Sequence, residues 1–109
     1  MKTLLFPFFF FAAISANAQF GKKDPNKTTQ TVETACGECQ FKMKGKSCDL
    51  AVRLNGKTYF VEGTKIDDHG DAHAKDGFCN AVRKAEVQGE IKDEKFVATY
   101  FKLLPEKTN

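Results

Sequence analysis

Hydrophobic and polar residues alternate with a period of two across residues 50–63, "LAVRLNGKTYFVEG", on both sides of Asn55-Gly56. This alternation is typical of strands with one buried face. Asn-Gly is the preferred pair for a two-residue type I′ turn, because both positions need a positive φ. The pattern therefore predicts a β-hairpin whose register gathers the apolar residues on one face. These residues are Leu50, Val52, Leu54, Tyr59 and Val61.

A second alternating pair of segments lies near the C-terminus. Residues 85–91, "AEVQGEI", and residues 95–104, "KFVATYFKLL", are separated by turn-forming residues and predict another hairpin. Upstream, residues 31–35, "TVETA", and residues 40–43, "QFKM", have strand character and are interrupted by the C-x-x-C motif. The chain thus has the pattern of a mainly β protein.

Residues 67–85, "DDHGDAHAKDGFCNAVRKA", have a different period. Their apolar residues follow spacings of three, one and three, which place them on one helical face. Asp76 is a suitable N-cap for a short helix over 77–84. The apolar residues of this face are Phe78, Ala81, Val82 and Ala85.

The order of strand, hairpin, short helix and hairpin predicts the fold. Five strands with one helix between the third and the fourth indicate a small OB-like Greek-key barrel. An open antiparallel α+β sheet is the alternative. Neither fold implies a function, because small barrels serve many.

The first 18 residues have the pattern of a secretory signal peptide. Lys2 is followed by an 11-residue apolar run, Leu4 to Ile14, and by the small-x-small sequence Ala16-Asn17-Ala18. The run is too short to span a bilayer. Since no cysteine precedes residue 36, no lipid can be attached through a cysteine near the cleavage site. We therefore expect a periplasmic or secreted protein without a membrane span after signal removal.

The remaining chain is divided by composition. Residues 19–30 are polar and predict a flexible leader, residues 31–105 form one small domain, and residues 106–109 are a tail. The full chain has a formal charge of +3 and its lysines are scattered among acids. This distribution offers no support for a nucleic-acid partner. A domain of this size is marginally stable unless cross-links or a metal ion strengthen it.

Four cysteines provide the candidate chemistry, with the spacing C-x2-C-x8-C-x30-C. In a short exported chain this count indicates disulfides first. Proximity in sequence favours the pairs Cys36–Cys39 and Cys48–Cys79. The hairpin returns the chain to its start, so we expect all four cysteines to converge in one cluster.

The same residues fit two other kinds of site. Four thiolates are the ligand set of a structural Zn²⁺ site or a Cu(I) site, so Zn or Cu is the candidate cofactor. His69 and His73 are spaced i, i+4 and are possible further ligands, with Asp71 placed to orient a ring. The C-x-x-C motif also permits thiol–disulfide redox chemistry, but no βαβ pattern surrounds it and Glu38 opposes thiolate formation.

No catalytic residue can be named from the sequence. No phosphate-binding glycine loop and no activated serine is present. The sequence favours an exported accessory or binding domain over an enzyme. The identity of a protein partner is not encoded in any recognisable motif.

Four segments taken together resemble a known family. They are "ACGECQF", "GKSCDLAV", "DDHGDAHAKDGFCN" and "KAEVQGE". They are similar to a family of small exported bacterial proteins of unknown function that share this cysteine and histidine framework. The resemblance covers roughly residues 34–103. It implies a type of domain and no particular activity.

Overall fold

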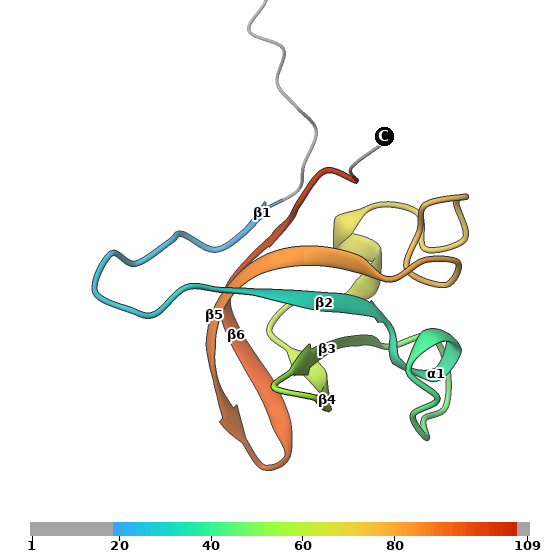
Figure 1. The fold of residues 1–109 in the computed structure, drawn as a ribbon, viewed down its shortest axis with the longest axis horizontal. Helices are drawn as coiled ribbons and strands as arrows, with labels where there is room; N and C mark the ends of the chain where they lie inside the picture. Colours follow the sequence, from blue (N-terminus) through green and yellow to red (C-terminus); the bar gives the residue numbers. More distant parts are fainter. Residues whose placement is uncertain (1–18, 107–109) are drawn as a thin grey trace, which may run out of the picture.

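The computed structural model describes residues 19–106, so the expected signal peptide over 1–18 lies outside the described residues. Six strands, one short α-helix and one 3₁₀ helix make up this part of the chain (Figure 1). In chain order they are β1 Gln19–Phe20, β2 Gln30–Cys36, α1 Gly37–Gln40, β3 Leu50–Leu54, β4 Lys57–Glu62, η1 Ile66–His69, β5 Arg83–Lys92 and β6 Lys95–Leu103.

Strands β2 to β6 close into a barrel. Their order around the sheet is β5, β2, β3, β4 and β6, and β6 pairs again with β5. All these pairings are antiparallel except β4 with β6, where Val61 lies opposite Phe96 in a parallel register. This arrangement confirms the five-stranded OB-like barrel, and the open-sheet alternative is wrong because no sheet edge is left between β5 and β6.

The first hairpin has the predicted register. Asn55 and Gly56 have φ values of 50° and 82°, as a type I′ turn requires. The observed pairs include Leu54 with Lys57 and Val52 with Tyr59. Because this register holds, the apolar side chains of β3 and β4 face the barrel interior or pack against it.

The second hairpin forms as well, with a β-bulge in β6. Gln88 lies opposite Tyr100 while Gly89 lies opposite Ala98, so Thr99 has no partner in β5. The alternation predicted for residues 85–91 is confirmed, because every second residue of that stretch lies opposite a buried residue of β6. Ile91 is still 47% exposed because it lines a cavity, and Gln88, on the other face, is only 2% exposed.

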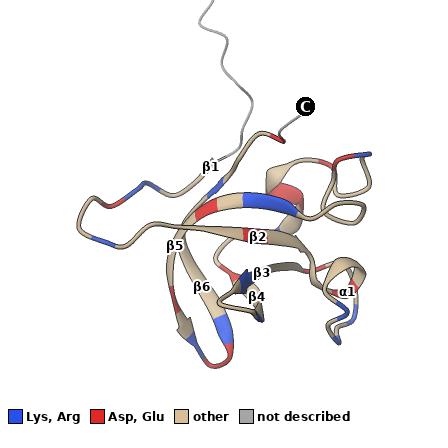
Figure 2. Ribbon diagram, viewed as in Figure 1, with Lys and Arg blue, Asp and Glu red and all other residues tan. Residues whose placement is uncertain are grey.

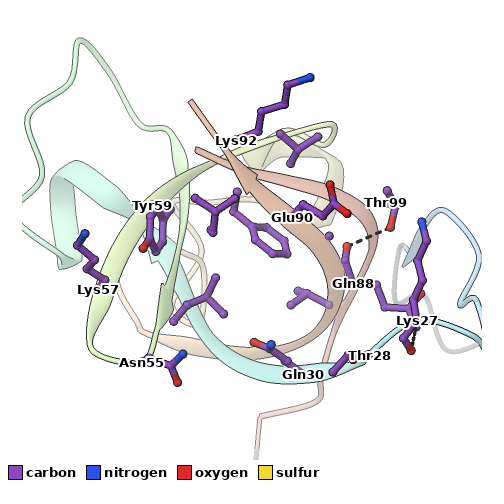
Figure 3. A pocket seen from close by; sticks show the side chains of 16 residues that line it. Lys27, Thr28, Gln30, Asn55, Lys57, Tyr59, Gln88, Glu90, Lys92 and Thr99 are labelled. Carbon is purple, nitrogen blue, oxygen red and sulfur yellow. Dashed lines mark hydrogen bonds between the residues drawn. The ribbon is translucent and has the colours of Figure 1, made fainter. Parts of the chain in front are cut away.

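The two ends of the barrel differ. At the end where β2 finishes, the segment between β4 and β5 covers the core with buried Ile66, Ala72 and Phe78. The opposite end, where β2 begins, opens into a cavity of about 710 Å³. Figure 3 looks into this open end, with Lys27, Lys57 and Lys92 around it.

Residues 19–30, which the composition predicts to be flexible, contact the barrel at both ends of the segment. Strand β1 pairs with the end of β6. Farther along, the buried Gln88 carboxamide accepts a hydrogen bond from the Asp24 N–H at 2.8 Å and donates to the Asp24 carbonyl at 2.9 Å and the Thr29 hydroxyl at 2.8 Å. These contacts cover the Gln88 side chain, which accounts for its burial on the outer face of β5.

The helix expected over 77–84 does not form. Residues 71–82 make a series of turns, in which the Asn80 side chain donates to the carbonyls of His73 and Ala74. Strand β5 already starts at Arg83 because Arg83 and Lys84 pair with β2. The apolar spacing misled the prediction, since Val82 is 39% exposed while Phe78 is buried.

The strand expected over residues 40–43 is also absent. Instead, the C-x-x-C motif forms the single helical turn α1, and the chain reverses at Lys42, which has a φ of 56°. Among residues 19–106, neither helix has the length and apolar content required to cross a membrane.

Candidate metal centre

The four cysteines converge at the covered end of the barrel. We call Cys36, Cys39, Cys48 and Cys79 the cysteine cluster. Their Sγ atoms all lie within 4.8 Å of one another. The shortest described separations are 3.2 Å between Cys48 and Cys79 and 3.8 Å between Cys39 and Cys48. This convergence confirms the expectation drawn from the hairpin, although Cys79 arrives on a turn and not on a helix.

Backbone hydrogen bonds hold the three segments of the cluster together. The Cys36 N–H donates to the Phe78 carbonyl at 3.0 Å, which fixes the residue next to Cys79. The Gly37 N–H donates to the Asp49 carbonyl at 2.8 Å, which fixes the residue next to Cys48. The relative positions of the cysteines therefore follow from main-chain bonds at the end of β2.

Two side chains of α1 strengthen this arrangement. The Gln40 amide donates to the Cys79 carbonyl at 2.8 Å. The Glu38 carboxylate accepts hydrogen bonds from the Asp49 N–H at 2.9 Å and, more weakly, the Ser47 N–H at 3.4 Å. Both residues lie within or next to the C-x-x-C motif. Their side chains therefore bind α1 to the segments that carry Cys48 and Cys79. The sequence pattern alone did not single out either role.

The loop between Cys39 and Cys48 folds back onto the outside of the barrel. The Phe41 ring lies 4.6 Å from the Arg53 guanidinium, in cation–π geometry. The Met43 N–H donates to the Gly37 carbonyl at 3.0 Å. A Cβ at Gly45 would displace the Glu38 carboxylate from its present position, so glycine favours this close approach. Phe41, Met43 and Gly45 thus hold the loop against the barrel and α1.

The even-numbered residues of that loop are basic and exposed. Lys42, Lys44 and Lys46 all face solvent beside the cysteine cluster. Figure 2 shows basic residues on the loop that follows α1. None of the three forms an ion pair with a residue in the described part of the chain. The alternation in this loop, which resembled a strand in the sequence, therefore separates residues that contact the protein from three exposed, unpaired lysines.

Burial sets the protonation of the thiols. Cys36 is fully buried, and burial, together with its hydrogen bond to the Cys39 thiol, raises the pKa of Cys36 well above its ordinary value. Burial and the hydrogen bond to Cys48 raise the pKa of Cys79 to about 12. In contrast, hydrogen bonds with Cys79, Cys36 and Cys39 lower the pKa of Cys48. The cluster therefore stabilises one thiolate, at Cys48, and resists forming several without a compensating cation.

The pKa values of Glu38 and Asp49 shift in opposite directions. Burial opposes ionisation of Glu38, but its hydrogen bonds with Asp49 and Ser47 outweigh that effect and lower the pKa of Glu38. The hydrogen bond to Glu38 raises the pKa of Asp49. The Glu38 carboxylate is thus the charged member of the pair, and it lies 3.8 Å from the Cys36 Sγ.

The sulfur positions agree with a tetrahedral ligand set. Four thiolates about 2.3 Å from a Zn²⁺ ion stand about 3.8 Å apart along each edge of a regular tetrahedron. The 3.8 Å separation matches that edge, the 3.2 Å separation is shorter, and all four sulfurs lie within 4.8 Å of one another. All four cysteines are free thiols in the structure. The residues present therefore fit a four-thiolate metal site.

The histidines lie apart from this geometry. Neither His69 nor His73 belongs to the group of close ligand atoms found among the described residues. The His69 ring is buried against Phe101, with ring centroids 4.4 Å apart, and its Nε2 lies 2.8 Å from the Thr64 hydroxyl. His73 is exposed, and its N–H donates to the Asp71 carboxylate. The structure thus brings together the cysteines and leaves the proposed histidine ligands and Asp71 in the neighbouring loop.

A redox role receives little support from the same geometry. In a C-x-x-C redox site the first thiol is exposed and has a lowered pKa. Here Cys36 is fully buried and its pKa is raised by that burial. The helix that follows it has only four residues.

Comparison with family models places the fold and the cluster in context. A model for a family of unknown function, DUF6370, matches residues 30–104. The chain belongs to the DUF6370 family. The matched range of this DUF6370 protein contains all five barrel strands and all four cysteines. No curated protein and no solved structure matches the chain.

Proposed function

We propose that this DUF6370 protein is an exported metal-binding domain that holds a thiophilic ion, Zn²⁺ in the first place, with the four thiolates of the cysteine cluster. The observation that carries the proposal is the convergence of four Sγ atoms from three segments within 4.8 Å. Two disulfides require only that each sulfur meets one partner. A tetrahedral ion requires all four to meet at one point.

The electrostatics of the site support the same conclusion. Four thiolates around Zn²⁺ carry a net charge of −2, and the buried Cys36 cannot ionise readily alone. A bound divalent cation supplies the charge that stabilises the thiolates. Lys42, Lys44 and Lys46 balance the remaining negative charge from the solvent side.

The hydrogen bonds around the cluster imply a preformed site. The bonds from Cys36 to Phe78 and from Gly37 to Asp49 belong to the barrel framework. The barrel core includes Cys36, but it is filled mainly by other residues of β2, β3, β5 and β6. We therefore infer that the protein folds without the ion, unlike a zinc finger, and that the ion adds stability by mass action.

Disulfide bonding is the second candidate. Cys48 and Cys79 form the closest pair, at 3.2 Å, and an oxidising compartment favours disulfides. This candidate keeps the pairing expected from the sequence, with Cys36 bonded to Cys39. Cu(I) is the alternative ion, because thiolates are also its preferred ligands.

The deciding experiment uses protein exported by its native host and purified without chelator or reductant. Elemental analysis and a free-thiol count are made on the same sample. One Zn per chain with four thiols after metal removal supports the proposal. No metal with no free thiols supports two disulfides, and one Cu per chain identifies the other ion.

Cobalt substitution tests the ligand set. The Co²⁺ form is expected to absorb in the visible range as a tetrahedral thiolate complex, and Cys36→Ser is expected to weaken or abolish that spectrum. His73→Ala is the matched control because His73 is exposed and lies outside the cluster. A Co²⁺ spectrum lost in His73→Ala and retained in Cys36→Ser would contradict the four-thiolate site. Mass spectrometry of the protein exported by the native host gives the mature N-terminus, which we expect at Gln19.

A further inference from the structure

The cysteine cluster is asymmetric in its access to solvent. Cys36 is fully buried, Cys48 and Cys79 are half-buried, and Cys39 is exposed. Cys39 is also held differently from Cys36 and Cys79, because no other segment of the described residues bonds to its backbone. The side of Cys39 is therefore the most open approach to the cluster for an incoming ligand.

The approach to Cys39 is positively charged. Lys42, Lys44 and Lys46 occupy the exposed side of the loop that starts three residues after Cys39. The acidic groups in the same stretch are Glu38, which is directed at backbone N–H groups, and Asp49, which is exposed. Free lysines around an entrance raise the local concentration of anions and their rate of encounter.

We propose that the metal ion enters and leaves through ligand exchange at Cys39, with an anionic chelating ligand that the Lys42, Lys44 and Lys46 loop attracts. This inference rests on the proposed function. In the exchange, a donor atom of the chelator forms a bond to the ion as the Cys39 sulfur releases it. The Cys39 thiolate then takes a proton from water, and no electrons change hands. The domain is thus suited to passing its ion to an anionic acceptor and not merely to retaining it.

The fold also provides a matched control for the charge. Lys27, Lys57 and Lys92 lie around the opposite, open end of the barrel (Figure 3). They are exposed and form no ion pair within the described chain. Substituting three lysines with glutamine at either end changes the net charge by the same amount, so a difference between the two triple variants reports position alone.

The experiment follows Zn²⁺ transfer from the loaded mature protein to EDTA, which is anionic, and to TPEN, which is neutral. The rate is expected to rise linearly with chelator concentration, because exchange is associative. For Lys42→Gln, Lys44→Gln and Lys46→Gln combined, transfer to EDTA should slow about tenfold at low salt, and the difference should vanish at high salt. Transfer to TPEN should stay within twofold, as should EDTA transfer from the control triple variant.

A second measurement identifies the thiol and does not require a metal. Reduced, metal-free protein is treated with limiting DTNB, an anionic disulfide, and with neutral 4,4′-dithiodipyridine, and the labelled peptides are mapped by mass spectrometry. Cys39 should be labelled before Cys36 and Cys79 by both reagents. The lysine-loop triple variant should slow only the DTNB reaction.

The outcomes separate this inference from the proposed function. Protein that binds no metal contradicts the proposed function, and the exchange route falls with it. Two results would overturn the inference alone. One is a Zn²⁺ transfer rate that does not depend on chelator concentration. The other is an equal decrease in the EDTA transfer rate for both triple variants. Labelling of Cys36 or Cys79 before Cys39 overturns it as well.

Discussion

Gln88→Met tests whether the buried carboxamide holds residues 19–30 on the barrel. Gln88 is 2% exposed, and its side chain bonds to Asp24, Thr29 and, at 3.3 Å, the Lys27 carbonyl. Methionine has a similar length and no strong hydrogen-bonding group. The substitution therefore removes the polar contacts while filling most of the same volume.

The size of the effect follows from these contacts. Three good hydrogen bonds are lost, each with a net value of about 1 kcal/mol, because the released groups of the exposed segment regain water. A buried thioether returns roughly 1 kcal/mol of apolar stabilisation. The free energy of unfolding should fall by about 2 kcal/mol. For a domain of this size that corresponds to a melting temperature lower by about 8–16 °C.

Urea unfolding gives the free energy, and hydrogen exchange read by mass spectrometry shows which segment loosens. Exchange should accelerate in residues 19–30 and remain slow in β3 and β4. Gln30→Met is the matched control, because Gln30 is exposed and its side chain has no described hydrogen bond. A loss below about 0.5 kcal/mol, with unchanged exchange in residues 19–30, would show that Gln88 does not anchor this segment.

Three further predictions concern the turn, the acid side of the stability curve and the cluster. Gly56→Val should destabilise the protein by about 1–2 kcal/mol in urea, because valine resists the φ of 82°; equal stability with the control Lys57→Val would contradict the turn. Hydrogen bonds from Lys23 and Tyr100 lower the pKa of Glu86 below its ordinary 4.5. The folded state therefore favours ionised Glu86, and its contribution, complete above pH 4.5, is lost as the pH falls through the lowered value. Glu86→Gln should flatten thermal stability measured between pH 5 and 3, and an unchanged slope would refute this linkage. Gln40→Met removes the bond to the Cys79 carbonyl and should weaken Zn²⁺ binding about 3- to 10-fold in competition with a chromophoric chelator. Identical affinity would mean that this bond does not position Cys79.

The barrel was predictable because its signals are local. A strand alternates with a period of two, and Asn55-Gly56 specifies both the turn and the register of the hairpin. Antiparallel pairing of β3 with β4 brings the end of β4 back beside the start of β3. The convergence of the cysteines follows from that return, which is why it could be inferred from spacing.

The errors arose where tertiary pairing outweighed a local pattern. The spacing of Phe78, Val82 and Ala85 fits a helical face, but the strand ladder with β2 and β6 takes the chain from Arg83 onward. Backbone hydrogen bonds in a closed barrel satisfy more groups than a two-turn helix can. In the same way, alternation within β5 could not show that Gln88 is buried, because its burial depends on residues 24–29 packing against it.

The sequence by itself determined the signal-like N-terminus, the two hairpins and the identity of the sulfur ligands, because each depends on neighbouring residues. Only the tertiary structure decided how those ligands are arranged. Burial of Cys36 and exposure of Cys39 depend on where the end of β2 meets the loop before β5. The separation of His69 from the cluster is also decided by packing, because the Phe101 ring and the Thr64 hydroxyl hold His69 in the core. Spacing along a chain limits which residues can meet, but packing in three dimensions selects which of them do.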